Sequence, residues 1–414
     1  MRGTAIAITG STLIDGTGAE PWGPVTVLID GNRIAAVGPA GKVEVPQGTQ
    51  VFEARGKTMM PGLIDAHVHI ESPGDLDPTR RLRELIPFSA VRATVHARLM
   101  LEAGFTAVRD AGGIGYVAIG VRQAIDLGLV AGPRVQAAGH PLHMTGGHGG
   151  TFYAPEIRVD WAGEVDGADE ARKAARLQLK MGADVIKLIA STSGGALSTG
   201  IATEAPQLTV EEMKAAVDEA HKAGKRAMAH AHAAQAIKNA IMAGIDTIEH
   251  GSRMDDEGIE MMLERDIPVV TAGVPPFRIS QHGVDSGVPE YAVRKARADV
   301  ESRRGVFEKW LSAGVKIALG TDCGTPFNRP GENAVGLEVL VMNGLTTMQA
   351  IVSSTRIAAE ALGMADRTGT IQQGKLADIL ILDGDPLTDI RVLQDKQKLL
   401  LIMKDGLAFK NHLG

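Results

Sequence analysis

Short apolar runs alternate with helical patterns through the middle of the chain, and this alternation constrains the fold more than any other feature. The segments between the runs, such as 89–104 and 209–224, have helical apolar spacing and end in glycine, a common helix C-cap. Strands that alternate with helices form parallel sheets, and eight such units make a (β/α)8 TIM barrel. We count eight runs, at 62–69, 106–112, 134–139, 183–190, 226–232, 247–251, 268–274 and 316–322. We therefore predict an α/β TIM barrel. A doubly wound open sheet is the alternative, but no glycine-rich phosphate motif follows the first run.

The two ends of the chain have a different pattern. Residues 1–58 contain short runs rich in Val and Ile, cut by Gly, Pro and the hairpin signal Asp30-Gly31-Asn32. The C-terminal stretches "KLADILILDGDP" and "LLLIMKDGLAFK" repeat this style. We predict that 1–58 and 361–414 pair into a small β-sandwich domain, with the barrel domain at 59–360.

Charge and cysteine content exclude several classes of function. The 43 basic residues are outnumbered by 49 acidic ones, so no basic surface for nucleic acid is expected. No 18-residue apolar run predicts a membrane span, and the N-terminus lacks a signal-peptide core, so we expect a cytoplasmic protein. Cys323 is the single cysteine, which excludes a cysteine-rich zinc site. A metal here needs nitrogen and oxygen ligands.

Polar residues stand at the C-terminal ends of several of these runs. In a barrel these ends converge on one mouth, where active sites lie, and alternation along a strand puts His67 and His69 on one side. Imidazole and carboxylate ligands suit zinc, and also Mn, Co or Fe. We predict two divalent cations, with zinc as the first expectation, and Asp322 as a ligand of the first. The predicted ligands are His67, His69, Lys187, His230, His250 and Asp322.

Lys187 needs a separate explanation, because a cationic amine would be repelled by two metal ions. We hypothesise that its amine reacts with carbon dioxide to give a carbamate that bridges both ions. Metal coordination lowers the pKa of water to about 7 and so supplies a nucleophile at neutral pH. Asp322 would accept the proton from this nucleophile and pass it to a leaving amine. His148 is a candidate donor to the oxyanion.

The motifs that carry these residues resemble the amidohydrolase superfamily, in its binuclear subtype with a carboxylated lysine. They are "PGLIDAHVH", "DVIKLIA", "MAHAH", "IEHGS" and "GTD", and the C-terminal "GKLADILILDGDP" is similar to that superfamily's companion sandwich domain. The set in this order is specific, whereas "GTD" alone would carry no information. The resemblance covers nearly the whole chain.

Within that superfamily, "FTAVRDAGG", "TGGHGG" and "AGIDTIEHGS" resemble the Xaa-Pro dipeptidase and metallocarboxypeptidase-like group, which includes ochratoxin-hydrolysing enzymes. This resemblance implies that His148 contacts the substrate carbonyl and that His232 helps to hold a substrate carboxylate. The spacing of twenty residues favours His230 over His232 as the partner ligand of His250. His143 is a weaker substrate-binding candidate, with turn stabilisation as its alternative. The run "ASTSGGALSTG" after Lys187 departs from the more compact "ASGG" of relatives.

These features predict a metal-dependent hydrolase of an amide C–N bond in a small substrate, either a dipeptide such as Xaa-Pro or an N-acyl amino acid of the ochratoxin type. A mononuclear deaminase or imidazolonepropionase-like hydrolase is the alternative, but such enzymes normally lack the lysine. Lactonase or esterase activity at the same site is chemically open. A non-enzymatic relative would usually have lost ligands, and none is missing here. Analogy with relatives predicts a homo-oligomer.

Overall fold

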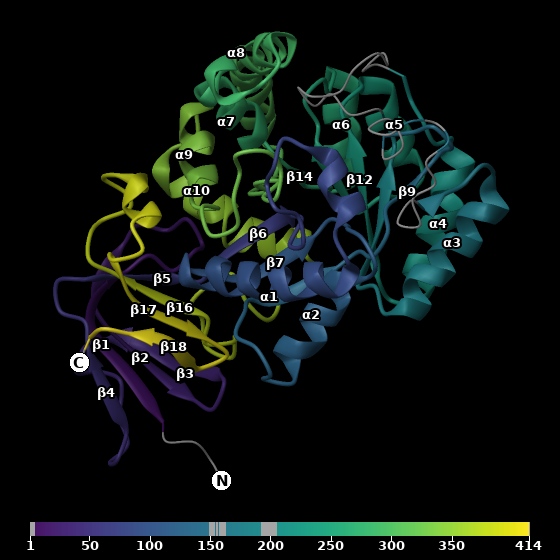
Figure 1. Ribbon diagram of the computed structural model, residues 1–414. Coiled ribbons are helices and arrows are strands. Elements are labelled where there is room, and N and C mark those ends of the chain that lie inside the picture. The colour runs from purple at the N-terminus through teal and green to yellow at the C-terminus, as the bar shows by residue number, and fades with distance from the viewer. Residues whose placement is uncertain (1–4, 149–153, 155, 157–162, 192–204, 414) are drawn as a thin grey trace.

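The computed structural model of the protein describes residues 5–148, 154, 156, 163–191 and 205–413. Strands and helices alternate through the middle of the chain, and a separate β-sheet unit contains both chain ends (Figure 1). Each of the eight predicted apolar runs overlaps a strand of a parallel sheet. These strands are β6 (Leu63–Val68), β7 (Phe105–Asp110), β8 (Arg134–Ala137), β11 (Val185–Ile189), β12 (Arg226–Ala231), β13 (Thr247–His250), β14 (Val269–Val270) and β15 (Ile317–Ala318).

The parallel strands form two sheets and not one continuous barrel. One has the order β6-β7-β8, and the other has the order β10-β9-β11-β12-β13-β14-β15. The short strands β9 (Leu142–His143) and β10 (Gly163–Glu164) were not predicted. Backbone hydrogen bonds connect the two sheets at both places where they meet. Between β6 and β15 the Ala66 N–H donates to Leu319 O at 2.9 Å, and between β8 and β11 the Asp184 N–H donates to Ala137 O at 2.8 Å. The fold is therefore α/β and of the TIM-barrel type, although the predicted closed barrel is not seen as a single sheet.

Helices cover the parallel strands, and local sequence sets their limits. Thr209 and Glu212 form a reciprocal capping box at the start of α4, which satisfies backbone N–H groups that have no partner within the helix. Gly182 adopts a φ of 98° at the end of α3, a left-handed conformation that glycine reaches without steric cost. The α-helices are α1 (Ile86–Glu102), α2 (Val117–Asp126), α3 (Ala168–Met181), α4 (Val210–Lys222), α5 (Ala234–Met242), α6 (Asp256–Glu264), α7 (Val274–His282), α8 (Glu290–Ala313), α9 (Val335–Met342), α10 (Thr347–Ser353) and α11 (Arg356–Ala361). Short 3-10 helices are η1 (Pro78–Arg83), η2 (Val284–Ser286) and η3 (Ile390–Gln394).

Both chain ends contribute to one mixed sheet, as predicted. Its order is β18-β17-β16-β5-β1-β2-β3, and β4 pairs with β1, so N-terminal and C-terminal strands lie side by side (Figure 1). The predicted hairpin turn at Gly31-Asn32 joins β2 to β3. The two-layer sandwich is not confirmed, because these strands belong to a single sheet. They are β1 (Ile6–Leu13), β2 (Trp22–Asp30), β3 (Arg33–Pro39), β4 (Gln50–Glu53), β5 (Thr58–Pro61), β16 (Ile379–Leu382), β17 (Leu399–Lys404) and β18 (Leu407–Asn411).

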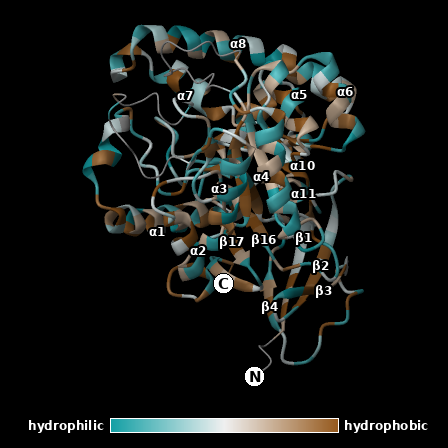
Figure 2. Ribbon diagram, turned by 90° about the vertical axis from the view of Figure 1, so that its right-hand side faces the viewer, coloured by the Kyte–Doolittle hydropathy of each residue, from teal (hydrophilic) through white to brown (hydrophobic). Residues whose placement is uncertain are grey.

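Apolar burial joins the β-unit to the barrel region. Met60, Leu380 and Leu399 from the mixed sheet belong to the same buried cluster as Phe105 and Ile186 from the parallel sheets. In Figure 2 strands β16 and β17 are largely brown, whereas helices along the rim alternate between teal and brown. Among the described helices, none is long and apolar enough to cross a membrane. The strands that position the candidate site are thus held by one shared core.

Candidate metal centre

The first group of candidate ligands forms where the ends of β6 and β15 meet. The Asp322 N–H donates to His67 O at 2.8 Å and the His69 N–H donates to Cys323 O at 2.7 Å, which fixes the two segments in register. Asp322 Oδ1 lies 3.3 Å from Nε2 of His69 and 3.7 Å from Nε2 of His67. Asp322 has a φ of 58°, an uncommon conformation for a non-glycine residue that often marks a functional site. Two imidazoles and one carboxylate therefore converge on a volume of the size of one ion.

The second group comes from β12 and β13. One ring nitrogen from each of His230, His232 and His250 lies within 4.8 Å of the others. The ring centroids of His67 and His250 are 5.3 Å apart, so the two groups adjoin. His250 also has a left-handed backbone, with a φ of 73°. Nδ1 of His232 lies 2.7 Å from the Ser252 hydroxyl, so this contact leaves Nε2 as the other ring nitrogen available to a cation or substrate.

Lys187 is buried in β11, with 2 % of its surface exposed. Among the residues that the structure describes, its Nζ has no hydrogen-bond partner, and the same holds for Nε2 of the buried His230. Burial lowers the pKa of Lys187 to about 8, although the nearby charges of Glu249 and Asp322 act to raise it. A buried polar atom without a partner costs roughly 1–3 kcal/mol, so such atoms are retained mainly where a function requires them. These two atoms fit a site that a cation or a modified amine would complete.

The protonation states of most of these side chains suit a cation. The exception in the metal-free chain is His69: burial acts to lower its pKa, but the hydrogen bond to Asp322 and the charges of Asp322 and Asp110 raise it. Burial, followed by the charges of neighbouring groups, lowers the pKa of His230 and His250 well below the ordinary value, and burial lowers that of His67 to about 4. These imidazoles are neutral at pH 7 and each has a lone pair to offer. Burial acts to raise the pKa of Asp322, but the hydrogen bond from His69 and the neighbouring positive charges hold it at about 2. Neutral imidazole and ionised carboxylate are the states that bind metal.

Glu249 is a residue of this region that the sequence reasoning missed. It is fully buried in β13, and its Oε2 accepts from Nδ1 of His67 at 2.7 Å. Its Oε1 accepts from Nη2 of Arg109 at 2.8 Å and from the Thr247 hydroxyl at 2.6 Å. The sequence offered one signal for this pair. Glu249 stands in one apolar run and Arg109 in another, and charged residues that are buried are usually paired.

The predicted substrate-contacting histidines also lie against the cluster. The rings of His148 and His230 stack with centroids 4.8 Å apart, and burial lowers the pKa of His148 to about 3. The His148 N–H donates to Oε1 of Gln207 at 3.3 Å, a contact that was not predicted. His143 is 2 % exposed, with Nδ1 2.9 Å from Met144 O, and its Nε2 has no partner among the described residues. Most of the "ASTSGGALSTG" run, residues 192–200, lies outside the described residues.

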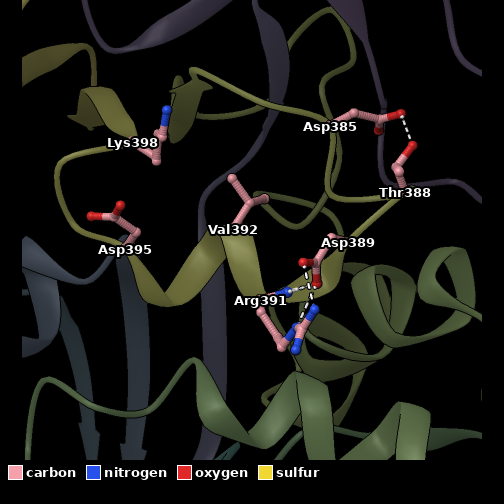
Figure 3. A pocket seen from close by; sticks show the side chains of 7 residues that line it. All are labelled: Asp385, Thr388, Asp389, Arg391, Val392, Asp395 and Lys398. Atoms are coloured by element: carbon pink, nitrogen blue, oxygen red, sulfur yellow. Dashed lines mark hydrogen bonds and ion pairs between the residues drawn. The ribbon is translucent and has the colours of Figure 1, made fainter.

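A separate hollow lies near the C-terminal end of the chain (Figure 3). Several of the side chains that line it pair with one another: Asp385 with Thr388, and Asp389 with Arg391. It contains no histidine, and its carboxylates are largely engaged by these partners. Its lining residues are Asp385, Thr388, Asp389, Arg391, Val392, Asp395 and Lys398. We therefore place the candidate site at the histidine cluster.

Comparison with known proteins identifies the family of the chain. The family model for the amidohydrolase family matches residues 58–408. The chain belongs to this family. The amidohydrolase is 33% identical to ochratoxinase from Aspergillus niger over 428 residues, covering 97% of this chain and 86% of that enzyme. The predicted membership is thereby confirmed.

Solved structures extend the comparison across the whole chain. The amidohydrolase superposes on a Xaa-Pro dipeptidase with methionine bound in its active site, with a TM-score of 0.89, 34% identity and coverage of 99% of this chain and 100% of that one. A prolidase complexed with N-methylphosphonate-L-proline also gives a TM-score of 0.89, at 32% identity and the same coverage. The predicted similarity to the ochratoxinase and dipeptidase-like group is confirmed, and the chain is a hydrolase that acts on C–N bonds.

Proposed function

We propose that this amidohydrolase cleaves the amide C–N bond of a small substrate with a free carboxylate, either a dipeptide such as Xaa-Pro or an N-acyl amino acid. The observation that carries this proposal is the pair of adjoining groups of candidate ligands, which meet where the ring centroids of His67 and His250 are 5.3 Å apart. Lys187 is buried nearby, and its Nζ has no partner among the described residues. The substrate class rests on the similarity to ochratoxinase and to a Xaa-Pro dipeptidase.

We assign the cation-holding role to the residues that the sequence predicted. His67, His69 and Asp322 would hold one ion, and His230 and His250 the second, with zinc as the proposed metal. The donor set of imidazole and carboxylate suits zinc, and the low pKa values of His67 and Asp322 leave the lone pairs of these two groups free of protons at neutral pH. Lys187 as a carbamate would bridge the two groups. Its pKa of about 8 supports this role, because only the neutral amine reacts with carbon dioxide.

The chain's own residues would then perform the proton transfers. When bound, the two cations supply Lewis-acid activation of the substrate carbonyl and of water. Asp322, ionised because its pKa is held at about 2, would accept a proton from the attacking water and deliver it to the leaving nitrogen. His148 would donate to the developing oxyanion, and its contact with Gln207 would hold the loop in place. His232 and His143 would contact the substrate, His232 through its carboxylate.

A substrate screen tests this proposal. Metal-replete enzyme is assayed with Xaa-Pro, Xaa-Arg and Xaa-Phe dipeptides and with N-acyl amino acids, each beside its C-terminally amidated counterpart. We expect hydrolysis of at least one free acid and a kcat/KM at least tenfold lower for its amide. Equal rates for both forms would contradict recognition of a carboxylate. Cleavage confined to matched esters or lactones would favour the esterase alternative.

Metal content separates the binuclear proposal from the mononuclear one. We expect two ions per active chain, measured by elemental analysis after gel filtration. One ion per fully active chain would support a mononuclear hydrolase and would remove the reason for a bridging carbamate on Lys187.

A further inference from the structure

Glu249 and Arg109 form a buried pair directly beneath the candidate metal centre. The Arg109 side chain is 1 % exposed to solvent and the Glu249 side chain is 0 % exposed. Arg109 lies in β7 and Glu249 in β13, strands that belong to different sheets. A buried ion pair contributes little net stability, because desolvation of the two charges offsets their attraction. The pair therefore calls for an explanation other than stability.

The contacts of Glu249 divide between its two oxygens. Oε1 receives both the Arg109 guanidinium, at 2.8 Å, and the Thr247 hydroxyl, at 2.6 Å. Oε2 receives Nδ1 of His67 at 2.7 Å. With two donors on one oxygen, the carboxylate has a single orientation in which the other oxygen points at His67.

This arrangement determines which nitrogen of His67 faces the cluster. Nδ1 must carry the proton in order to donate to a carboxylate, so the lone pair is on Nε2. Nε2 is the atom that lies 3.7 Å from Asp322 Oδ1. A partner on the second nitrogen of a metal-binding histidine fixes the ring and raises its basicity.

Arg109 is anchored in turn by main-chain oxygens. Its Nε donates to Ala66 O at 2.8 Å, and its Nη1 donates to Ala361 O at 3.3 Å, at the end of α11. Ala66 immediately precedes His67 in β6. The guanidinium thus connects the backbone beside His67 and the carboxylate that holds the His67 ring.

We propose that Glu249, oriented by Arg109 and Thr247, is the positioning residue that presents Nε2 of His67 to the metal centre. The inference rests on the proposed function, because it assumes that His67 binds a cation. Glu249 itself contacts neither a cation nor substrate in this role. Its effect should appear in the affinity for metal, and only through that affinity in turnover.

The test measures Zn2+ affinity by chelator competition in the absence of substrate. We expect Glu249→Gln to bind the more weakly held Zn2+ about 10- to 100-fold less tightly than wild type. Because the single variant leaves Arg109 buried without its partner, the double variant Arg109→Met/Glu249→Leu is measured as well, and it should show a loss of the same size. Circular dichroism and thermal unfolding confirm that each metal-free variant is folded.

Glu219→Gln is the matched control. Glu219 is a carboxylate in α4 that is 8 % exposed and binds Arg172 and Arg176, outside the histidine cluster. We expect its Zn2+ affinity to stay within twofold of wild type. An unchanged affinity in both the single and the double Glu249 variants, or an equal loss in Glu219→Gln, would overturn the inference. Failure of wild type to bind Zn2+ would instead overturn the proposed function, so the two failures are distinguishable.

Discussion

Replacing Lys187 with methionine should make the metal-free protein more stable at neutral pH and should abolish its metal-dependent activity. The two side chains are similar in length, so the change removes the amine without leaving a large cavity. Lys187 is buried, and its Nζ has no hydrogen-bond partner in the described part of the chain. In the absence of metal, the buried amine therefore lowers the free energy of unfolding of the wild-type chain, and the variant lacks this destabilisation.

The magnitude of this cost follows from the pKa of Lys187. Burial lowers it from 10.5 to about 8, and this shift corresponds to about 3 kcal/mol of differential stability. The folded-state pKa is below the unfolded one, so the cost is complete below pH 8 and disappears as the pH rises through 10.5. At pH 7 roughly one folded chain in ten has a neutral Lys187, against roughly one in three thousand for an unperturbed lysine.

The assay is chemical unfolding of chelator-treated protein in buffer free of carbon dioxide, at pH 7 and at pH 10. We expect Lys187→Met to exceed wild type by about 2–3 kcal/mol at pH 7, and by clearly less at pH 10. Lys238→Met makes the same chemical change in a lysine that is paired with Asp255 and Glu257, and it should give no gain.

The matching functional measurement is metal content and turnover after reloading. Lys187→Met should bind fewer ions and lose nearly all hydrolysis, because the proposed bridging group is gone. A variant that is less stable than wild type at pH 7, or equally stabilised at both pH values, would refute the burial argument. Full activity of the variant would refute the bridging role.

Three further predictions concern the same site. Asp322→Asn should lower kcat roughly 100- to 10,000-fold in steady-state assays, with a smaller change in KM, because proton transfer is lost; a kcat within tenfold of wild type would argue against this role. Glu249 has a pKa of about 2, because the Arg109 charge and the His67 hydrogen bond outweigh burial, which acts to raise it. Its folded-state pKa lies below the unfolded 4.5, so its contribution is present above pH 4.5 and is lost as the pH falls toward 2. Urea unfolding at pH 6 and pH 3 should therefore show a larger acid-induced loss of stability for metal-free wild type than for Arg109→Met/Glu249→Leu, and equal losses would count against the pair. Treatment with 1,10-phenanthroline should stop hydrolysis, and two equivalents of Zn2+ per chain should restore it; full recovery with one equivalent, or resistance to the chelator, would contradict a binuclear centre.

The parallel strands were predictable because their runs are largely apolar and alternate with segments of helical pattern. In a sheet covered on both faces every residue is buried, as in β11, so a continuous apolar run is a reliable signal. β9 and β10 have two residues each, as do β14 and β15, but Leu142–His143 and Gly163–Glu164 do not stand within a continuous apolar run, so no periodic signal marked them. The grouping of the strands into two sheets was equally inaccessible, since it depends on the hydrogen-bond geometry at the seams.

The candidate ligands were predictable for a related reason. Residues at the C-terminal ends of parallel strands share one edge, so a linear list of His67, His230 and Asp322 already implies proximity. The left-handed backbones of His250 and Asp322 could not be inferred, because Asp and His adopt this conformation more often than most residues do but still at only a small share of their positions. The carboxylate of Glu249 was overlooked because its partner Arg109 is 140 residues away in the chain.

The sequence by itself determined the periodic pattern of strands and helices, the family and the chemical type of the candidate ligands. Each of these depends only on the types of the residues and their order along the chain. The tertiary structure decided which nitrogen of His67 faces the cluster, how closely the two groups of candidate ligands adjoin and that Lys187 is buried with no partner among the described residues. Those properties depend on distances of a few ångströms between distant segments, and they follow only from the way in which the packed strands bring the side chains together.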